Sequence, residues 1–509
     1  MLILQAYTCQ CEKKTLMANW AVLGATNVQG LPWRPSLTTT SIGNFNVHAN
    51  LSNFLINIPS WPSITSNRRQ RVKPFMCNSV PIERLPNEND CGAHKSERKA
   101  LRELCGNAVP GYILDRIEEV GFAVATDVQE QALPVVLSGV DCIIHAQTGS
   151  GKTLAYLLAI FAVVDARRTA VQALIVVPTR ELGMQVTKAA RLLAASYPKN
   201  VGLANKESIN VMPLLDGGSL NRQKIWLKAE PPQIMVATLG CLCQLLEKEI
   251  LKLDAIKVLV TDEVDSIFGA AKQTYLLRKL LTSYTSINNR QTIFASASIP
   301  QHRQFIDNCI QQKWTKRDVV HVHVHPIEPM PSRLSHRYIT YQKDEKLDIL
   351  ASLLQVDTPK SGIIFVNKQS EKSKRTGLPP ATNAVTEYLR QFYSKESGKS
   401  YKIKEILLLE ENMNINARTA SLSELRKGNH LLVATDIAAR GLDLPETSHI
   451  YNFDLPKSAT DYLHRAGRTG RKPFSNEKSL ITNLITTNER FVLERIENEL
   501  SFTCEEITL

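Results

Sequence analysis

Several common features are missing from this chain of 509 residues, and each absence excludes a class of protein. The longest uninterrupted apolar run, residues 154–164, is far shorter than the roughly 20 residues that cross a bilayer. The ten cysteines lack the paired CxxC spacing of a zinc site, so we expect them to be buried free thiols in a reducing compartment. We therefore expect neither a membrane-spanning protein nor a disulfide-stabilised one.

Acidic residues are nearly absent from the first 80 residues. Glu12 is the only acid there, against seven basic residues and fourteen serines and threonines. Such a segment is typical of an organelle transit peptide, and the lack of arginine in its first dozen residues favours the chloroplast over the mitochondrion. A disordered extension without a targeting role is the alternative. This segment carries half of the net charge of +12, so the mildly basic remainder does not by itself indicate a nucleic-acid partner.

The most informative segment is a glycine-rich octapeptide that lies between an apolar run at 140–145 and a helical pattern at 154–164. Backbone N–H groups of such a turn, together with a helix N-terminus, hold the phosphates of a nucleotide. Lys152 would reach the β- and γ-phosphates, and the Thr153 hydroxyl would ligate Mg²⁺. The predicted nucleoside triphosphate site consists of Ala146, Gln147, Thr148, Gly149, Ser150, Gly151, Lys152 and Thr153.

From about residue 100, apolar runs alternate with helical patterns, which predicts an α/β fold with parallel sheets. A polar, proline-bearing stretch at 325–332 indicates a hinge, and 368–382 reads as a surface insertion. Strands are expected at 142–146, 173–177, 233–238, 258–261, 291–295, 362–366, 431–435 and 449–453. The domain boundaries that follow are a transit segment at 1–80, a linker at 81–99, a domain at 100–325, a hinge at 326–332 and a domain at 333–509.

Two further motifs carry chemistry. Asp262 and Glu263 follow an apolar run, and we expect Asp262 to hold the metal through water and Glu263 to deprotonate an attacking water. Residues 464–471 contain three arginines and two glycines, a composition that suits neither a core nor a regular helix. These arginines could bind a phosphate backbone, but we favour arginine fingers that reach the γ-phosphate.

In their order along the chain, these motifs resemble the DEAD-box family of ATP-dependent RNA helicases, within helicase superfamily two. The resemblance covers residues 104–471, and the chain looks like a plant organelle-targeted member. It implies two tandem RecA-like domains, each a mainly parallel sheet flanked by helices, after a disordered extension. It also implies RNA-stimulated hydrolysis of ATP with Mg²⁺, coupled to local unwinding of RNA or remodelling of its complexes. We expect a monomer that contacts the sugar-phosphate backbone of RNA without sequence preference and binds no membrane, with a protein cofactor as a possible further partner.

The resemblance also implies roles for single residues. Adenine would contact Phe122 and Gln129, the ribose would contact Asp443, and the fingers would be Arg468 and Arg471. The residues placed on RNA are Thr179, Arg180, Gly218, Thr238 and Thr435. The residues that would couple hydrolysis to strand separation are Asp265, Ser296, Ser298 and His464.

Departures from the family pattern fall mainly on the RNA contacts. Leu239 and Cys241 replace a proline and an arginine, and Ile415 replaces a glutamine, although Arg418 remains. Other replacements are Leu104, Ala125, Val264 and Ser298. We therefore expect an ATPase with weaker or more partner-dependent RNA affinity. An ATP-gated RNA clamp with little unwinding is the main alternative; an RNA-binding module with a silent ATPase and a DNA helicase fit the motifs less well.

Overall fold

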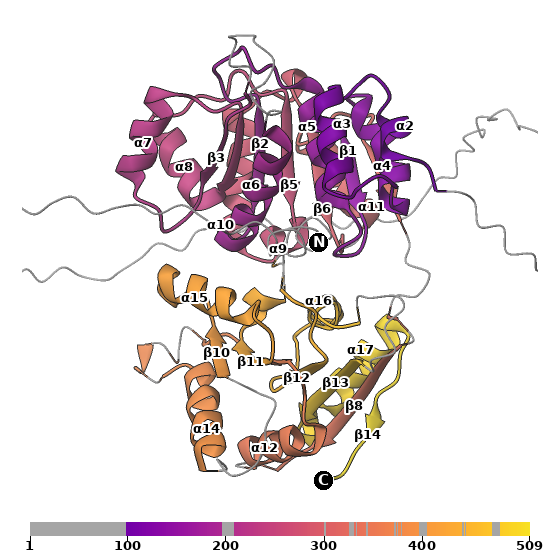
Figure 1. The fold of residues 1–509 in the computed structure, drawn as a ribbon, viewed down its shortest axis with the longest axis vertical. Coiled ribbons are helices and arrows are strands. Elements are labelled where there is room, and N and C mark those ends of the chain that lie inside the picture. The colour runs from indigo at the N-terminus through magenta and orange to yellow at the C-terminus, as the bar shows by residue number, and fades with distance from the viewer. Residues whose placement is uncertain are drawn as a thin grey trace, which may run out of the picture. The chain divides into compact units, whose positions relative to one another are not determined.

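The computed structural model describes two parallel sheets with their helices (Figure 1). The residues that it describes are 98–195, 208–299, 302–324, 330–331, 333–342, 345–370, 373, 375–377, 379–395, 405–439, 442, 444–470 and 479–509. All of them belong to one unit of the chain. The transit segment at 1–80 and most of the linker and the hinge lie outside these residues, so those boundaries stay predictions.

The first sheet has seven strands in the order β3-β4-β2-β5-β6-β1-β7, and every pair of neighbours is parallel. Its strands are β1 (Cys142–His145), β2 (Ala173–Val177), β3 (Val211–Leu214), β4 (Ile234–Thr238), β5 (Val258–Asp262), β6 (Gln291–Ser296) and β7 (Val320–His323). The helices around it are α2 (Leu101–Cys105), α3 (Gly111–Glu119), α4 (Asp127–Leu137), α5 (Lys152–Val163), α6 (Arg180–Ala194), α7 (Leu220–Ala229), α8 (Leu239–Glu247), α9 (Val264–Phe268), α10 (Ala271–Lys279), η3 (Leu280–Tyr284), η4 (Ile287–Asn289) and α11 (His302–Gln311).

Alternating residues of the first sheet build two separate cores. Ile144 of β1 and Ile175 of β2 pack with α4, α5 and α6, whereas Ile143 and Leu174 pack with α8, α10 and α11. Successive side chains of a strand point to opposite faces, so a strand that is apolar throughout must be covered on both sides. This explains why β2 is a continuous apolar run, and β4 and β6 are likewise buried along their whole length.

The second sheet repeats this plan, with seven parallel strands in the order β10-β11-β9-β12-β13-β8-β14. Its strands are β8 (Leu334–Thr340), β9 (Gly362–Phe365), β10 (Glu405–Leu409), β11 (His430–Ala434), β12 (His449–Asn452), β13 (Ser479–Ile485) and β14 (Glu505–Glu506). Its helices are α12 (Lys346–Asp357), α14 (Ala381–Lys395), α15 (Ile415–Leu425), η5 (Asp436–Ala438), α16 (Ala459–Ala466), η6 (Thr487–Glu489) and α17 (Arg490–Leu500). Core clusters again lie on both faces, one with α16 and α17 and the other with α12 and α14.

The fold class expected from the sequence is confirmed: each sheet is parallel and flanked by helices. All eight expected strands are present, with ends shifted by at most a residue or so. The strands that the sequence reading missed are β3, β7, β8, β10, β13 and β14, which either lie at or next to a sheet edge or, like β13, carry polar residues. The predicted helix at 154–164 begins two residues earlier, at Lys152, directly after the glycine turn.

One expectation was wrong in part. The surface insertion predicted at 368–382 ends inside α14, where Thr382 is buried and its hydroxyl donates to a carboxylate oxygen of Glu410 at 2.6 Å. A polar, proline-bearing sequence reads as a loop, but its last residues begin a helix that packs on β10.

The cysteines that the structure describes are free, and all except the half-buried Cys504 are buried, as expected. Among the described residues, no helix combines the length and apolar character needed to cross a bilayer.

Candidate nucleotide site and its coupling contacts

The glycine-rich turn connects the end of β1 to the start of α5. Gly149 and Gly151 have φ of 83° and 100°, a backbone region that side-chain-bearing residues rarely adopt. The Lys152 ammonium group donates to the carbonyl oxygens of Ala146 at 2.6 Å and Gln147 at 2.8 Å. Burial lowers the pKa of Lys152, and Asp262 is the carboxylate that opposes this most strongly. Lys152 is therefore hydrogen-bonded to the backbone of the predicted phosphate-binding turn.

Gln129 and Thr126 brace this turn, a role that the sequence reading missed. Thr126 caps α4 and forms a capping box with Gln129, whose side chain is buried. Thr126 also donates its hydroxyl to the Ser150 carbonyl at 2.7 Å, and Gln129 Nε2 donates to the Gly151 carbonyl at 3.3 Å. The spacing T-x-x-Q before an apolar stretch was a usable signal for this cap. The structure thus places Gln129 beside the phosphate turn, and Phe122 is half-buried.

Asp262 and Glu263 lie at the carboxyl end of β5, both buried. Asp262 Oδ2 accepts a hydrogen bond from the Tyr156 hydroxyl at 2.8 Å, and its Oδ1 accepts from the Glu263 N–H at 2.9 Å. Glu263 Oε2 accepts no hydrogen bond from any residue that the structure describes. Burial raises the pKa of Glu263 to about 7, with His464 and Arg468 opposing it. Burial also raises the pKa of Asp262, against the charge of Lys152.

Tyr156 was not predicted from the sequence. It stands one helical turn after Lys152 on α5, so both side chains lie on the same face of the helix. Burial raises the pKa of its hydroxyl well above the usual value, which keeps it a donor to Asp262. The i, i+4 spacing from Lys152 could have suggested this partner for the carboxylate.

Four residues predicted to couple hydrolysis to strand separation are in direct contact. Asp265 Oδ1 accepts from the Ser296 hydroxyl at 2.8 Å, and Oδ2 accepts from the Ser298 hydroxyl and from His464 Nε2, each at 2.8 Å. These hydrogen bonds, led by the one from His464, outweigh burial and lower the pKa of Asp265. A carboxylate on α9 is thereby linked to a histidine on α16, 199 positions later in the chain.

The arginine-rich segment corrects a second expectation. Residues 464–471 were judged unfit for a core, yet Arg465 and Arg468 are 0% and 1% exposed, and α16 continues through Ala466. Arg465 binds Asp436 at 2.7 Å and stacks on Phe365. Burial of arginine is tolerated here because the donors of each guanidinium group are matched by acceptors.

Arg468 is bonded to backbone oxygens in this structure. Its Nε and Nη2 donate to the Ala439 carbonyl at 3.0 and 2.6 Å, and Nη1 donates to the Leu442 carbonyl. Its charge is also among those that act on the pKa of Glu263. Arg471 and Asp443, the other expected finger and the expected ribose contact, lie outside the described residues.

The residues predicted to bind RNA have protein partners. Thr179 caps α6 by accepting from the Leu182 N–H, and Arg180 Nη1 donates to the Asp216 carbonyl at 2.8 Å. Thr238 is buried and accepts from the Asp216 N–H at 3.0 Å. In the second domain, the buried Thr435 donates to Glu411 at 2.9 Å. Gly218 is exposed, and a Cβ there would lie 2.6 Å from Gln223 Nε2.

The departures from the family pattern have packing roles. Leu239 and Cys241 are buried on α8, and the Cys241 thiol donates to Gln223 Oε1 at 3.3 Å. Ile415 contacts the backbone of Gly217, where a Cβ would lie 2.1 Å from Ile415 Cδ1. The positions of the family's arginine and glutamine therefore hold side chains that contact other protein groups here.

The ion pair between Arg418 and Glu181 joins α15 to α6. Arg418 Nη1 lies 2.9 Å from Glu181 Oε1, and the two side chains are 13% and 8% exposed. The arginine that the sequence reading noted as retained is thus paired with an acid of the first domain.

Two protein-family models match this chain. Residues 126–305 match the DEAD/DEAH box helicase model, and residues 345–473 match the helicase conserved C-terminal domain model. The chain is 59% identical to chloroplastic DEAD-box ATP-dependent RNA helicase 58 of Oryza sativa, over 81% of this chain and 90% of that protein. It is 58% identical to the Arabidopsis thaliana protein of the same name, over 89% and 94%.

Solved structures support the fold. Dbp5 of S. cerevisiae, bound to RNA and ADP BeF3, is similar with a TM-score of 0.64 at 22% identity, covering 80% of this chain and 95% of that one. Mss116p bound to ssRNA and AMP-PNP has a TM-score of 0.66 at 21% identity, covering 81% and 80%. With the matched domain models and the relatives of nearly 60% identity, the conclusion is that this chain belongs to the DEAD-box family of ATP-dependent RNA helicases.

Proposed function

We propose that the described site hydrolyses ATP and uses the contact between Asp265 and His464 to couple hydrolysis to RNA. The observation that carries this proposal is the arrangement around β5: a lysine on the phosphate turn, a buried Asp262 with a fixed orientation, and a Glu263 oxygen that no described residue engages. Triphosphate oxygens would displace the carbonyl partners of Lys152, and the N–H groups of residues 149–153 would face the phosphates.

The donor set at this site also fits Mg²⁺. Thr153 lies in the first turn of α5, and Asp262 is a buried carboxylate, so both offer the hard oxygen atoms that Mg²⁺ prefers. These two side chains would hold the ion, Asp262 through a water. When bound, the ion neutralises charge on the β- and γ-phosphates.

Glu263 is suited to be the general base. Its pKa of about 7 leaves a large ionised fraction near neutral pH and keeps the group basic enough to accept a proton. Water would attack the γ-phosphorus while its proton passes to Glu263 Oε2, and the bond to the β–γ bridging oxygen would break to release ADP. Arg468 would leave the carbonyls of Ala439 and Leu442 to face the γ-phosphate, and Arg471 would be the second finger.

RNA binding would depend on both domains. Thr179, Arg180, Gly218 and Thr238 lie at the carboxyl ends of first-sheet strands or in the segments that follow them, and Thr435 follows β11. Backbone contacts from such positions would hold a single strand without sequence preference. Because Asp265 contacts His464 as well as Ser296 at the end of β6 and Ser298 just after it, a change at the nucleotide would reach the second domain through Asp265.

A second candidate is an ATP-gated clamp that rarely separates strands. It is favoured by the loss of an arginine at Cys241 and of a glutamine at Ile415, both of which now serve packing. With fewer polar contacts, RNA affinity would depend more on a protein cofactor. We propose a monomeric protein for either activity.

The compartment is proposed to be the chloroplast. The acid-poor first 80 residues support an organelle address, and two relatives of nearly 60% identity are named chloroplastic. The mitochondrion is the alternative, and imaging of the full chain fused to a fluorescent protein would separate the two.

The deciding experiment measures steady-state ATP hydrolysis by the full chain, with and without single-stranded RNA. The Lys152→Ala variant is measured in the same way. Strong stimulation by RNA that the substitution abolishes supports the proposal, and a fluorescent duplex then separates unwinding from clamping. Hydrolysis that RNA does not change, or that survives the substitution, would contradict the assigned roles.

A further inference from the structure

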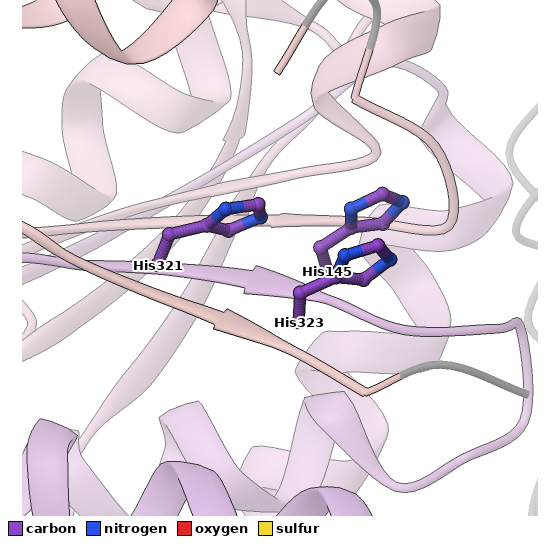
Figure 2. Close-up of side chains that lie close together, drawn as sticks. All are labelled: His145, His321 and His323. Atoms are coloured by element: carbon purple, nitrogen blue, oxygen red, sulfur yellow. The ribbon is translucent and has the colours of Figure 1, made fainter. Parts of the chain in front are cut away.

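Three histidines from two neighbouring strands lie together at one edge of the first sheet (Figure 2). His145 is the last residue of β1, and His321 and His323 alternate along β7. The register pairs His145 with His323 on one side and with Ser296 on the other, so these side chains share one face of the sheet. The rings of His145 and His323 stack with centroids 4.0 Å apart, and the His321 ring lies 5.7 Å from that of His145.

The spacing of these side chains suits a metal ion. One nitrogen of each imidazole lies within 4.8 Å of the other two, and the rings range from buried (His145) to half-buried (His321, His323). A tetrahedral zinc ion with Zn–N bonds of about 2.0–2.1 Å separates its nitrogens by about 3.4 Å. The rings are now nearly parallel, at 2° to 11°, so their lone pairs must be turned toward one point. Rotation about χ2 of histidine is soft, so the half-buried rings can turn without moving the strands.

We propose that His145, His321 and His323 bind one divalent transition-metal ion of the zinc type, with water in the fourth position. Two ligands at i and i+2 on one strand and a third on the adjacent strand fix three corners of a tetrahedron. Neutral imidazole is the ligand that such ions prefer, whereas Mg²⁺ and Ca²⁺ prefer oxygen, so the site is distinct from that of the nucleotide's metal.

A metal ion at this position would join two strands next to the phosphate turn. β7 is an edge strand and pairs only with β1 among the described strands. A metal ion with ligands from both strands would therefore stabilise their pairing. His145 directly precedes Ala146, whose carbonyl accepts from Lys152, and it neighbours Ser296 of the coupling contact. A bound ion would therefore stabilise the strand from which the phosphate turn begins.

The test measures zinc binding to the full chain by competition with a chromophoric chelator. Matched variants are His321→Gln and His323→Gln, which remove half-buried ligands and spare the residue next to the phosphate turn. The control is His430→Gln, which belongs to a second group of potential ligands with Glu405 and Glu424. Far-ultraviolet circular dichroism and the unfolding midpoint without metal show whether each variant keeps its fold.

We expect one tightly bound zinc per chain in the wild type that the His430→Gln chain retains. Each of the other two variants should bind it at least about 100-fold more weakly, since loss of even an outer-shell partner weakens a site about 10–100-fold. Zinc should raise the unfolding midpoint of the wild type and of the control, but not of those variants. Cobalt(II) should give the intense visible absorption of a tetrahedral site only when both β7 histidines are present. Equal zinc affinity in the wild type and in a variant that combines His321→Gln with His323→Gln, or no binding at micromolar zinc, would overturn the proposal.

Discussion

The two sheets have the same topology but different chemistry at equivalent positions. Strand for strand, the order β3-β4-β2-β5-β6-β1-β7 maps onto β10-β11-β9-β12-β13-β8-β14. Lys152 is the first residue of the helix after β1, and Lys346 is the first residue of the helix after the equivalent β8. Asp262 ends β5, and Asp454 follows the equivalent β12 by two residues.

The difference lies in what each lysine binds. Lys346 and Asp454 form a direct ion pair at 2.6 Å, and Lys346 also lies over the Phe453 ring. Lys152 is held instead by carbonyls of the glycine turn, and Asp262 is held by Tyr156. The second domain therefore has a salt bridge at the equivalent position, whereas in the first domain the lysine binds carbonyl oxygens and the aspartate binds a hydroxyl. The fold thus provides the same location twice, and the turn between strand and helix determines whether a nucleotide can bind there.

The largest expected effect comes from exchanging these lysines for alanine one at a time. Lys152→Ala should lower the ATPase rate by at least about 10³-fold, because a charge aimed at the transferring phosphate is lost. Lys346→Ala should leave the rate within a small factor but lower the free energy of unfolding by about 1–2 kcal/mol, because Asp454 loses its partner. Steady-state kinetics and chemical denaturation measure both. Equal loss of activity in the two variants would contradict the comparison.

The two carboxylates that follow equivalent strands should respond in opposite directions to amide substitution. Glu263→Gln should reduce the ATPase rate by about 10²–10⁴-fold, as loss of a general base does. It should also stabilise the nucleotide-free protein above pH 7 by roughly 3 kcal/mol, because the folded state raises the carboxyl pKa from 4.5 to about 7. Asp454→Asn should instead destabilise it, since Asp454 binds Lys346 and the Asn367 N–H.

The stability difference between the wild type and Glu263→Gln should depend on pH. A raised carboxyl pKa means that the folded state binds more protons than the unfolded state between pH 4.5 and about 7, so its contribution to stability falls as pH rises through that window. Thermal unfolding of wild type and Glu263→Gln at several pH values measures the difference. A gap between the two that does not widen over this window would show that Glu263 is not a strained buried acid.

The ionisation of Glu263 should also be visible in the pH dependence of the ATPase reaction. kcat/KM for ATP reports ionisations of the free protein, so it should fall about tenfold per pH unit below about pH 7, where Glu263 becomes protonated. The residual activity of Glu263→Gln should lack this limb. A wild-type profile that stays flat down to pH 5 would refute the assignment of the base.

The smallest expected effect concerns the link between the domains. Asp265→Asn and His464→Gln should each lower RNA-stimulated turnover by about 10–100-fold, and the double variant should be little worse than either, with a coupling energy of about 1–3 kcal/mol. Turnover without RNA should change less, because neither residue is placed at the phosphate. Additive losses in this double-mutant cycle would show that the 2.8 Å contact does not transmit the effect of RNA.

Local sequence patterns were enough to predict the α/β class, the central strands and the phosphate turn. These features depend on local signals: continuous apolar runs for strands buried on both faces, and glycines where φ must be positive. Edge strands such as β3, β7 and β14 escaped because their sequences are short or mixed and are stabilised by a neighbour. The roles of Phe122, Asp443, Arg471 and the residues placed on RNA stay predictions.

Which polar groups contact one another depends on the tertiary fold. Asp265 and His464 are 199 positions apart, and the histidines of β1 and β7 approach one another only because the register sets them side by side. The same holds for Arg465 and Arg468: local composition predicted that they lie outside a core, yet both are buried because backbone and side-chain oxygens accept their hydrogen bonds. Local propensity is read from neighbours in the chain, whereas the stability of a buried charge depends on partners that only the fold supplies.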